Sequence, residues 1–219
     1  MLNVLRGIIL SIMIIAFLLC GCVPKITHNL REISVNPNLQ IPSGDKMPLK
    51  MAIFAPEEFK NYTFPINQET FKGSIEVGRS IMVPFYSVMS SLFVNVVYLE
   101  DFFPGTKLDD PELQLVLLPK IDHFQWKFIS LGPASQMEAQ FTLSCEIYDP
   151  TGHLVHRVTQ SGIRSNSTLS MAFSGLNAVE SAEMPTLLVL EAVLNDLSSK
   201  ISANREKLVS AGGKTSSTK

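Results

Sequence analysis

The chain has 219 residues, and its 18 lysines and arginines nearly balance its 20 aspartates and glutamates, giving a net charge of −2. It has no run of more than two basic residues, so the charge pattern argues against an extended nucleic-acid-binding surface. A chain of this length holds one folded domain with flanking segments.

Residues 1–21 have the pattern of a secretory signal peptide. Arg6 is followed by about thirteen apolar residues, as expected for a basic start and an apolar core. The alternative is a permanent membrane anchor. A spanning helix needs about 20 apolar residues, and Gly21 and Pro24 interrupt this run before it reaches that length.

The end of this run, Leu19-Cys20-Gly21-Cys22, resembles the bacterial lipobox. In that motif a branched apolar residue, a tolerant position and a small residue precede an obligatory cysteine. The cysteine is acylated and becomes the first residue after cleavage, so the resemblance assigns lipidation to Cys22. The cysteine at the tolerant position is a small departure from the motif.

The lipobox interpretation leaves one thiol in the mature chain. Cys20 leaves with the signal peptide and the Cys22 sulfur is acylated, so Cys145 has no partner for an intramolecular disulfide. A metal site built on Cys20 and Cys22 would need further ligands, and His28 alone does not supply them.

The resemblance also implies a location. Several acyl chains on Cys22 would anchor the protein to a lipid bilayer, since one chain alone holds only reversibly. Val23 stands where enterobacterial lipoproteins kept at the inner membrane carry an aspartate. We therefore expect the outer membrane, with the protein facing the periplasm, and keep the periplasmic face of the inner membrane as the alternative.

Residues 22–48 read as an extended tether between the lipid and the domain, because their four prolines restrict the backbone. A single folded domain is expected at 49–208. Residues 209–219 are expected to form a disordered tail, because the last ten residues are small and polar.

The first half of the domain alternates between strand and helix patterns. An apolar strand is expected over 49–56, and the following segment, 57–73, is mixed and rich in turn residues. Apolar residues at helical spacing predict a helix over 81–93 with Pro84 near its start. A strand over 95–101 comes next.

Three longer strands follow. In 113–128, Pro119 cannot donate a ladder hydrogen bond, so a bulge or bend is expected there. Residues 136–149 alternate cleanly between apolar and polar side chains. The turn sequence DPTG at 149–152 leads into a returning strand, 153–163, which completes a hairpin.

A long helix is expected over 184–206. Its leucines and Ile201 recur at spacings of three and four residues, which gives one apolar stripe. Pro185 fits a position in the first turn.

Together these elements predict an α+β fold, a two-layer sandwich. An antiparallel-rich sheet of about four or five strands would carry two helices on one face, because the apolar stripes and the one-sided strands must cover each other. The opposite face would carry Glu138, Gln140, Thr142 and one of His153 and His156, and it would meet solvent or a partner.

This layout resembles outer-membrane lipoproteins of the YajG type and, more loosely, LptE and the periplasmic domain of CsgG. The residues that carry the resemblance are the lipobox, the strands at 112–121 and 136–149, and the helix at 190–201. YajG-type proteins bring no established chemistry. The likeness to LptE implies support of lipopolysaccharide export as a partner inside a barrel. CsgG lines a secretion channel, but this chain lacks an obvious pair of pore-forming hairpins.

No arrangement of residues predicts a catalytic, metal or cofactor site. Ser174 lacks the first glycine of G-x-S-x-G, and Cys145 lies on the apolar side of its strand, where packing is the expected role. His153 and His156 would point to opposite faces of a strand. The aspartate pair 109–110 offers too few carboxylates for a calcium site.

Aromatic residues supply the candidate interface. Phe102 and Phe103 are adjacent in a loop and cannot both be buried easily, which suggests contact with a partner. Trp126, between Phe124 and Phe128 on one side of a strand, fits either the core or an interface.

We therefore expect a non-enzymatic, lipid-anchored envelope protein that serves as a binding or scaffold subunit of an outer-membrane or cell-surface assembly. A carrier of an apolar ligand is the main alternative, and a hydrolase of envelope polymers is another. The sequence does not identify the envelope partner.

Overall fold

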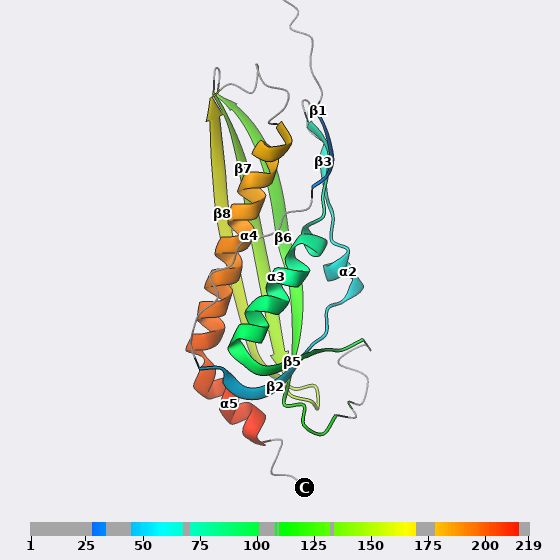
Figure 1. The fold of residues 1–219 in the computed structure, drawn as a ribbon, viewed down its shortest axis with the longest axis vertical. Helices are drawn as coiled ribbons and strands as arrows, with labels where there is room; N and C mark the ends of the chain where they lie inside the picture. Colours follow the sequence, from blue (N-terminus) through cyan, green and yellow to red (C-terminus); the bar gives the residue numbers. More distant parts are fainter. Residues whose placement is uncertain are drawn as a thin grey trace, which may run out of the picture.

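The computed structural model describes residues 28–33, 45–67, 71–100, 108, 110–131, 134–169 and 178–214. They form eight strands and four helices (Figure 1). In chain order these elements are β1 (His28–Ile33), β2 (Met47–Ile53), α2 (Glu57–Lys60), β3 (Phe64–Asn67), β4 (Phe71–Ile75), α3 (Val77–Leu92), β5 (Phe93–Tyr98), β6 (Leu115–Leu131), β7 (Ala134–Tyr148), β8 (Leu154–Leu169), α4 (Ala178–Ala203) and α5 (Arg205–Lys214).

The larger sheet has five strands in the order β5-β2-β6-β7-β8. β5 and β6 both pair with β2 in parallel, whereas β6, β7 and β8 form antiparallel pairs. The α+β class and the strand number agree with the sequence prediction, but the expected antiparallel-rich sheet is in fact mixed. The reason is that long connections separate β2 from β5 and β5 from β6, and the first of them contains α3. Each connection brings the chain back to the end of the sheet at which β2 begins, and such crossovers join parallel strands.

The two long helices, α3 and α4, lie on the same face of this sheet (Figure 1). Both begin earlier than predicted, at Val77 and Ala178, so Pro84 and Pro185 lie inside the helices and not in their first turns. The C-terminal helix is also divided at Asn204. Its amide donates to the Ile201 carbonyl at 3.1 Å in a tighter turn that ends α4, and its carbonyl accepts the Leu208 amide at 3.1 Å where α5 begins. α5 then continues to Lys214, so helical structure extends into the expected tail.

A second sheet, with the order β1-β4-β3, has no counterpart in the sequence prediction. β1 lies in the segment interpreted as a tether, and β3 and the start of β4 lie in the segment 57–73, interpreted as rich in turn residues. Pro65 and the positive-φ residue Gly73 interrupt the alternation that would have marked these two strands. α2, with only four residues, was also missed.

A bulge in β6 places its aromatic residues in the core. The register with β7 shifts between Ile121 and His123, whereas Pro119 keeps its regular partner Cys145. The bulge thus occurs just after the predicted position. Before it the odd-numbered residues such as Ile121 face the core, and after it the even-numbered Phe124 and Trp126 do.

The interface between β7 and α4 forms the centre of the core. The predicted alternation of β7 is confirmed, since its inward residues are all buried: Met137, Ala139, Phe141, Leu143, Cys145 and Ile147. α4 covers them with Val189, Leu190, Val193, Leu194, Leu197 and Ile201. Each such aliphatic side chain contributes about 1.5–3 kcal/mol when fully buried. Gly162 lets α4 approach β8, because a Cβ there would lie 2.9 Å from Val193 Cγ2.

The predicted turn between β7 and β8 is present. The Asp149 carboxylate accepts hydrogen bonds from the amides of Thr151 at 2.9 Å and His153 at 3.0 Å, and Gly152 has a φ of 92°. This is the turn geometry in which an aspartate side chain organises the backbone that follows it.

Candidate functional surfaces

Several predicted site residues lie outside the described part of the chain, and their roles stay predictions. They are the lipobox residues Leu19, Cys20, Gly21 and Cys22, the loop residues Phe102, Phe103 and Asp109, and Ser174. Among the described residues, no helix is long and apolar enough to cross a bilayer.

Trp126 belongs to the core. Its exposed fraction is 2%, and it lies in the same cluster as Phe124. The bulge in β6 explains this position, because it turns the aromatic residues toward the helices. The indole is therefore not on the surface. Of the two positions considered for Trp126, the core is correct and the interface is wrong.

Cys145 is also buried, as predicted, and it is a free cysteine. Burial, and secondarily the charge of Asp122, raises the pKa of its thiol far above the usual range. Since the thiolate is the reactive form, this sulfur serves packing and not nucleophilic chemistry.

The two histidines near the β7–β8 turn are held separately. His153 Nδ1 lies 2.7 Å from Thr151 Oγ1 in the turn, whereas His156 Nδ1 lies 3.3 Å from Lys207 Nζ of α5. Burial, and then the Lys207 charge, lowers the pKa of His156. Within the part of the chain that the structure describes, no three potential metal ligands come together.

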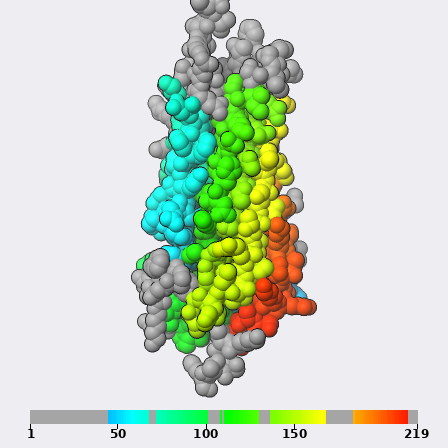
Figure 2. Space-filling model, turned by 180° about the vertical axis from the view of Figure 1, so that it is seen from behind, coloured from blue at the N-terminus to red at the C-terminus, as the bar shows by residue number. Residues whose placement is uncertain are grey.

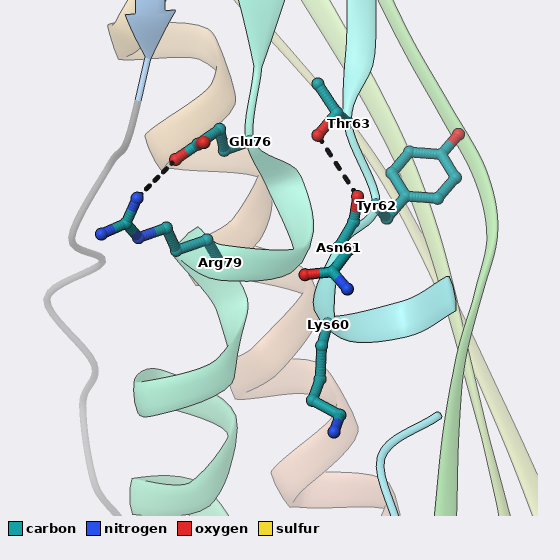
Figure 3. A pocket seen from close by; sticks show the side chains of 6 residues that line it. All are labelled: Lys60, Asn61, Tyr62, Thr63, Glu76 and Arg79. Atoms are coloured by element: carbon teal, nitrogen blue, oxygen red, sulfur yellow. Dashed lines mark hydrogen bonds and ion pairs between the residues drawn. The ribbon is translucent and has the colours of Figure 1, made fainter. Parts of the chain in front are cut away.

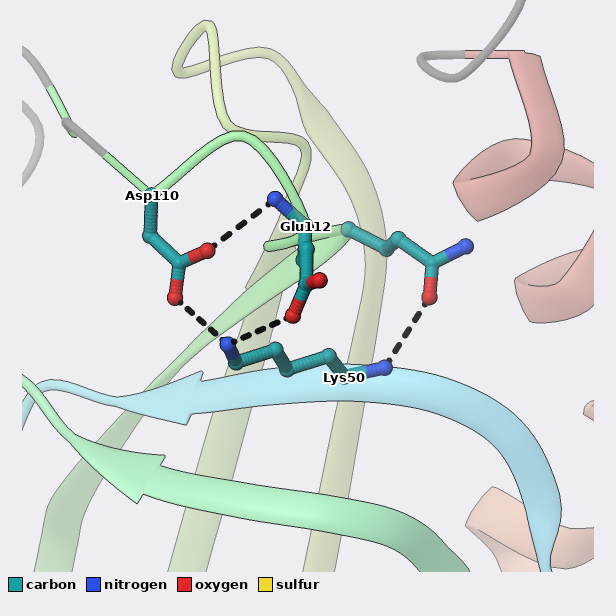
Figure 4. A network of polar contacts seen from close by, with 4 residues as sticks. Lys50, Asp110 and Glu112 are labelled. Carbon is teal, nitrogen blue, oxygen red and sulfur yellow. Dashed lines mark hydrogen bonds and ion pairs between the residues drawn. The ribbon is translucent and has the colours of Figure 1, made fainter.

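Lys50 forms a polar clamp between β2 and the segment that enters β6 (Figure 4). Its Nζ lies 2.8 Å from Asp110 Oδ2 and 3.3 Å from Glu112 Oε2. The Lys50 amide donates to Gln114 Oε1 at 3.0 Å, and the Gln114 amide donates to the Lys50 carbonyl at 3.0 Å. The hydrogen bond from Lys50 lowers the pKa of Asp110. The Lys50 ammonium thus forms an ion pair with Asp110, one of the two aspartates weighed above as calcium ligands.

A polar cavity of about 390 Å³ lies beside the start of α3 (Figure 3). Its lining consists of Lys60, Asn61, Tyr62, Thr63, Glu76 and Arg79. Arg79 pairs with Glu76 at 3.4 Å, and the Thr63 hydroxyl donates to the Asn61 carbonyl at 3.3 Å. The side chains of Lys60 and Asn61 both bond to Glu57, which lies outside the lining.

A smaller, apolar cavity of about 270 Å³ lies between α2 and β6. Pro56, Phe59, Tyr62, Leu118, Pro119 and Ile121 provide its apolar lining, with Glu58 and Lys120 beside them. Ligand pockets are usually about 300–1,000 Å³, so this space suits one aliphatic group better than a whole lipid.

Figure 2 shows the face of β6, β7 and β8 opposite the helices. The even-numbered residues of β7 from Glu138 to Glu146 are polar, as predicted for this face. Its side chains form cross-strand pairs, including the hydroxyls of Thr142 and Ser161 at 3.0 Å and an ion pair between Glu146 and Arg157. A hydrogen bond from Tyr148, and then Arg157, lowers the pKa of Glu146. His156 does not contribute to this face, since it lies against α5.

The outer strands of the larger sheet differ in what surrounds their edges. On β8, Lys200 Nζ donates to the Thr159 carbonyl at 2.9 Å and Arg164 Nη1 donates to the Ile163 carbonyl at 2.9 Å. On β5, the exposed fractions of Val94 and Tyr98 are 61% and 50%. Sequence analysis found this strand but not its exposure.

An aromatic pair flanks β5 on the helix side. The rings of Tyr86 and Tyr98 stack with centroids 4.8 Å apart, and the Tyr86 hydroxyl donates to the Val96 carbonyl at 3.0 Å. Val83, one turn earlier on α3, is 70% exposed. The sequence signal for this surface was the uncharged run FVNVVYL, residues 93–99, directly after an amphipathic helix.

No family model matches the chain, and no curated protein matches it. Among solved structures, it is similar to one described as a neuraminyllactose-binding hemagglutinin homolog from Helicobacter pylori, with 10% identity and a TM-score of 0.49 over 82% of this chain and 100% of that one. A Xanthomonas campestris protein of the DUF330 family gives 9% identity and a TM-score of 0.43 over 85% and 100%. A minor lipoprotein from Acinetobacter baumannii gives 12% and 0.38 over 76% and 95%. At these values the likeness carries no functional argument.

Proposed function

We propose that the chain is a non-enzymatic envelope lipoprotein, held to a bilayer by acyl chains on Cys22. Its domain would act as a binding or scaffold subunit of an outer-membrane or cell-surface assembly, on the periplasmic side, in the manner of YajG-type proteins. The observation that carries this proposal is the lipobox-like sequence Leu19–Cys22 at the end of a signal-peptide pattern.

The one-sided architecture of the domain supports a binding role. α3 and α4 cover one face of the larger sheet (Figure 1). The opposite face, which Figure 2 shows, carries paired polar side chains of β7 and β8. A sheet face with paired polar residues is a rigid surface on which a partner can dock without ordering loops first.

Mass analysis of the chain isolated from bacterial membranes tests the anchor. The expected product begins at Cys22 and carries the mass of several acyl chains. Cys22→Ser should abolish both processing and acylation, whereas the matched variant Cys20→Ser should retain them. An isolated chain that still begins at Met1, with an unmodified Cys22, would overturn the proposal.

Site-specific photo-crosslinking in cells tests the scaffold role. A crosslinking residue at Gln140 or Thr142, on the polar face, should capture an envelope protein. The same residue at Glu206, exposed on α5, is the control position. Equal capture at the face and the control, or none at either, would contradict docking on this face.

The apolar cavity beside α2 supports a second candidate, a carrier of an apolar ligand. Native mass spectrometry of protein purified from membranes should then show a bound apolar molecule that Leu118→Glu removes. A ligand-free wild-type protein would contradict this candidate.

A further inference from the structure

We propose that β5 is a self-association edge, at which two copies of this chain join their five-stranded sheets by antiparallel pairing of β5 with β5. This pairing goes beyond the proposed function, since it requires neither the lipid anchor nor another envelope protein. It rests on the sequence of the strand, on the direction of its backbone groups and on the apolar surface that flanks it.

The sequence of β5 lacks the features that normally protect an outer strand. Residues 93–99, FVNVVYL, contain no charge, no proline and no glycine, and β-branched or aromatic residues predominate. Outer strands of monomeric proteins usually carry lysine, proline or a bulge that prevents pairing with another chain. The register between β2 and β5 does shift, but the extra residue lies on β2, between Met47 and Lys50, and not on β5. Among the described residues, no strand lies beyond β5 in the sheet.

Hydrogen bonds show which backbone groups of β5 point outward. The Leu99 amide donates to the carbonyl of Ile53, the last residue of β2, at 2.9 Å. The backbone N–H and C=O groups of the odd-numbered residues of β5 therefore point toward β2. The Val96 carbonyl points the other way, where it accepts the Tyr86 hydroxyl at 3.0 Å. By this alternation Val94 and Tyr98 also direct their N–H and C=O groups outward. The bond from Tyr86 leaves Val96 able to pair, since a carbonyl oxygen has two lone pairs.

A second copy fits this edge better than a charged partner. With a two-fold axis at Val96, Val94 lies opposite the partner's Tyr98, and each such pair exchanges both of its N–H···O bonds. The most exposed aliphatic residue of the strand is thereby placed against its exposed aromatic residue, a favourable cross-strand combination. A symmetric dimer brings identical charges together, and the lack of charge in 93–99 removes that repulsion.

The surface beside the strand continues the apolar contact. Tyr86 stacks on Tyr98, and Val83 extends the same side of α3 by one turn. Glu100, the first charged residue after the strand, would lie opposite the partner's Leu92 at the end of the paired segment, away from the axis. The dimer would thus have an apolar centre with charges only at its rim.

Paired cysteines in the full chain test the register of this contact. In the proposed dimer Asn95 lies opposite the partner's Val97 in a non-hydrogen-bonded pair, where Cα atoms are about 4.5 Å apart, a separation that a disulfide spans. The variant Asn95→Cys/Val97→Cys should form a disulfide-linked dimer in cell membranes. Asn95→Cys/Leu99→Cys has no facing cysteine pair in this register and should give no disulfide-linked dimer, and neither should the unmodified chain.

A charge placed on the edge tests the contact without cysteines. The full chain in detergent should be dimeric by light scattering coupled to size-exclusion chromatography. Val94→Lys should weaken dimerisation at least tenfold, whereas Ile163→Lys, at a residue 52% exposed on β8, should leave it unchanged. Both positions are exposed, so neither lysine should disturb the fold. Circular dichroism of each variant checks this.

A wild-type chain that stays monomeric, or equal crosslinking of the two double-cysteine variants, would overturn the proposal. A crosslinked product of a mass other than the dimer would assign the edge to a different protein and overturn it too. These results are independent of whether Cys22 is acylated, so they do not decide the proposed function.

Discussion

β5 and β8 are the two outer strands of the same sheet, but their outward backbone groups meet different surroundings. Carbonyls along β8 accept hydrogen bonds from Lys200 and Arg164, whose charges also keep another strand away. Along β5, one tyrosine hydroxyl bonds one carbonyl, and Val94 and Tyr98 are exposed. The contrast indicates that β8 is protected against pairing and that β5 is open to it.

The difference follows from what packs beside each strand. α4 lies along β7 and β8, so its polar side reaches the edge of β8, where Lys200 contacts it. α3 leads directly into β5 and places Tyr86 and Val83 beside it, both of which add apolar surface. The edge of β8 is thus covered by a helix that places Lys200 on it, whereas β5 is bordered by a helix with aromatic and aliphatic residues.

Among the variants that test this difference between β5 and β8, Leu197→Ala should lower the stability of the protein most. Leu197 is fully buried on α4, one turn before Lys200. Leu197→Ala should lower the free energy of unfolding by about 2–5 kcal/mol and loosen the part of α4 that protects β8. Urea denaturation measures the first effect, and hydrogen exchange of β8 measures the second.

The control for this loss is Val83→Ala on α3. Val83 is exposed, so its replacement should change the free energy of unfolding by no more than about 0.5 kcal/mol. Similar losses for both variants would mean that α4 does not hold the edge of β8 as described.

Tyr86→Phe should have an intermediate effect, confined to β5. The change removes the hydroxyl that bonds the Val96 carbonyl and keeps the ring that stacks on Tyr98. The free energy of unfolding should fall by about 0.5–1.5 kcal/mol, while self-association at β5 persists. Loss of the dimer in this variant would show that the hydroxyl, and not the strand, directs the contact.

Removing the cations from the edge of β8 should have little effect on stability. It should, however, allow the edge of β8 to pair with another strand, as is proposed for β5. In the double variant Lys200→Met/Arg164→Met, the free energy of unfolding should change by no more than about 0.5 kcal/mol, and larger assemblies should appear by light scattering. Lys120→Met/Lys127→Met removes the same charge from β6 and is the control. Equal assembly in both variants would attribute the effect to net charge.

Local patterns in the sequence predicted those elements whose burial depends on one neighbour. The alternation of β7 and the apolar stripe of α4 each need only a single facing layer, and both are present as expected. The aspartate-led turn at Asp149 is local as well, and it also formed as predicted.

Features that depend on distant segments could not be obtained in this way. The alternation in β6 changes phase at a bulge, so the sequence left Trp126 open between core and surface. The parallel pairing of β2 with β5 and β6 is set by long connections, and a run such as FVNVVYL reads the same at the centre or the edge of a sheet. The exposure of β5 therefore emerged only from the strand order.

The smallest expected effect concerns the base of β8, where His156 lies against Lys207 of α5. Burial and the nearby ammonium lower the pKa of His156 in the folded protein below its ordinary value of 6.5. The unfolded chain then binds more protons than the folded one as the pH falls through about 6.5, so the contact between α5 and β8 is at full strength above this pH and weakens below it. The protection factors for hydrogen exchange at the start of β8, which correct for the intrinsic pH dependence of amide exchange, should be slightly lower at pH 5 than at pH 7.5. His156→Asn should remove that difference, whereas His153→Asn, in the exposed turn, should preserve it. An unchanged difference in His156→Asn would attribute the acid sensitivity to another group.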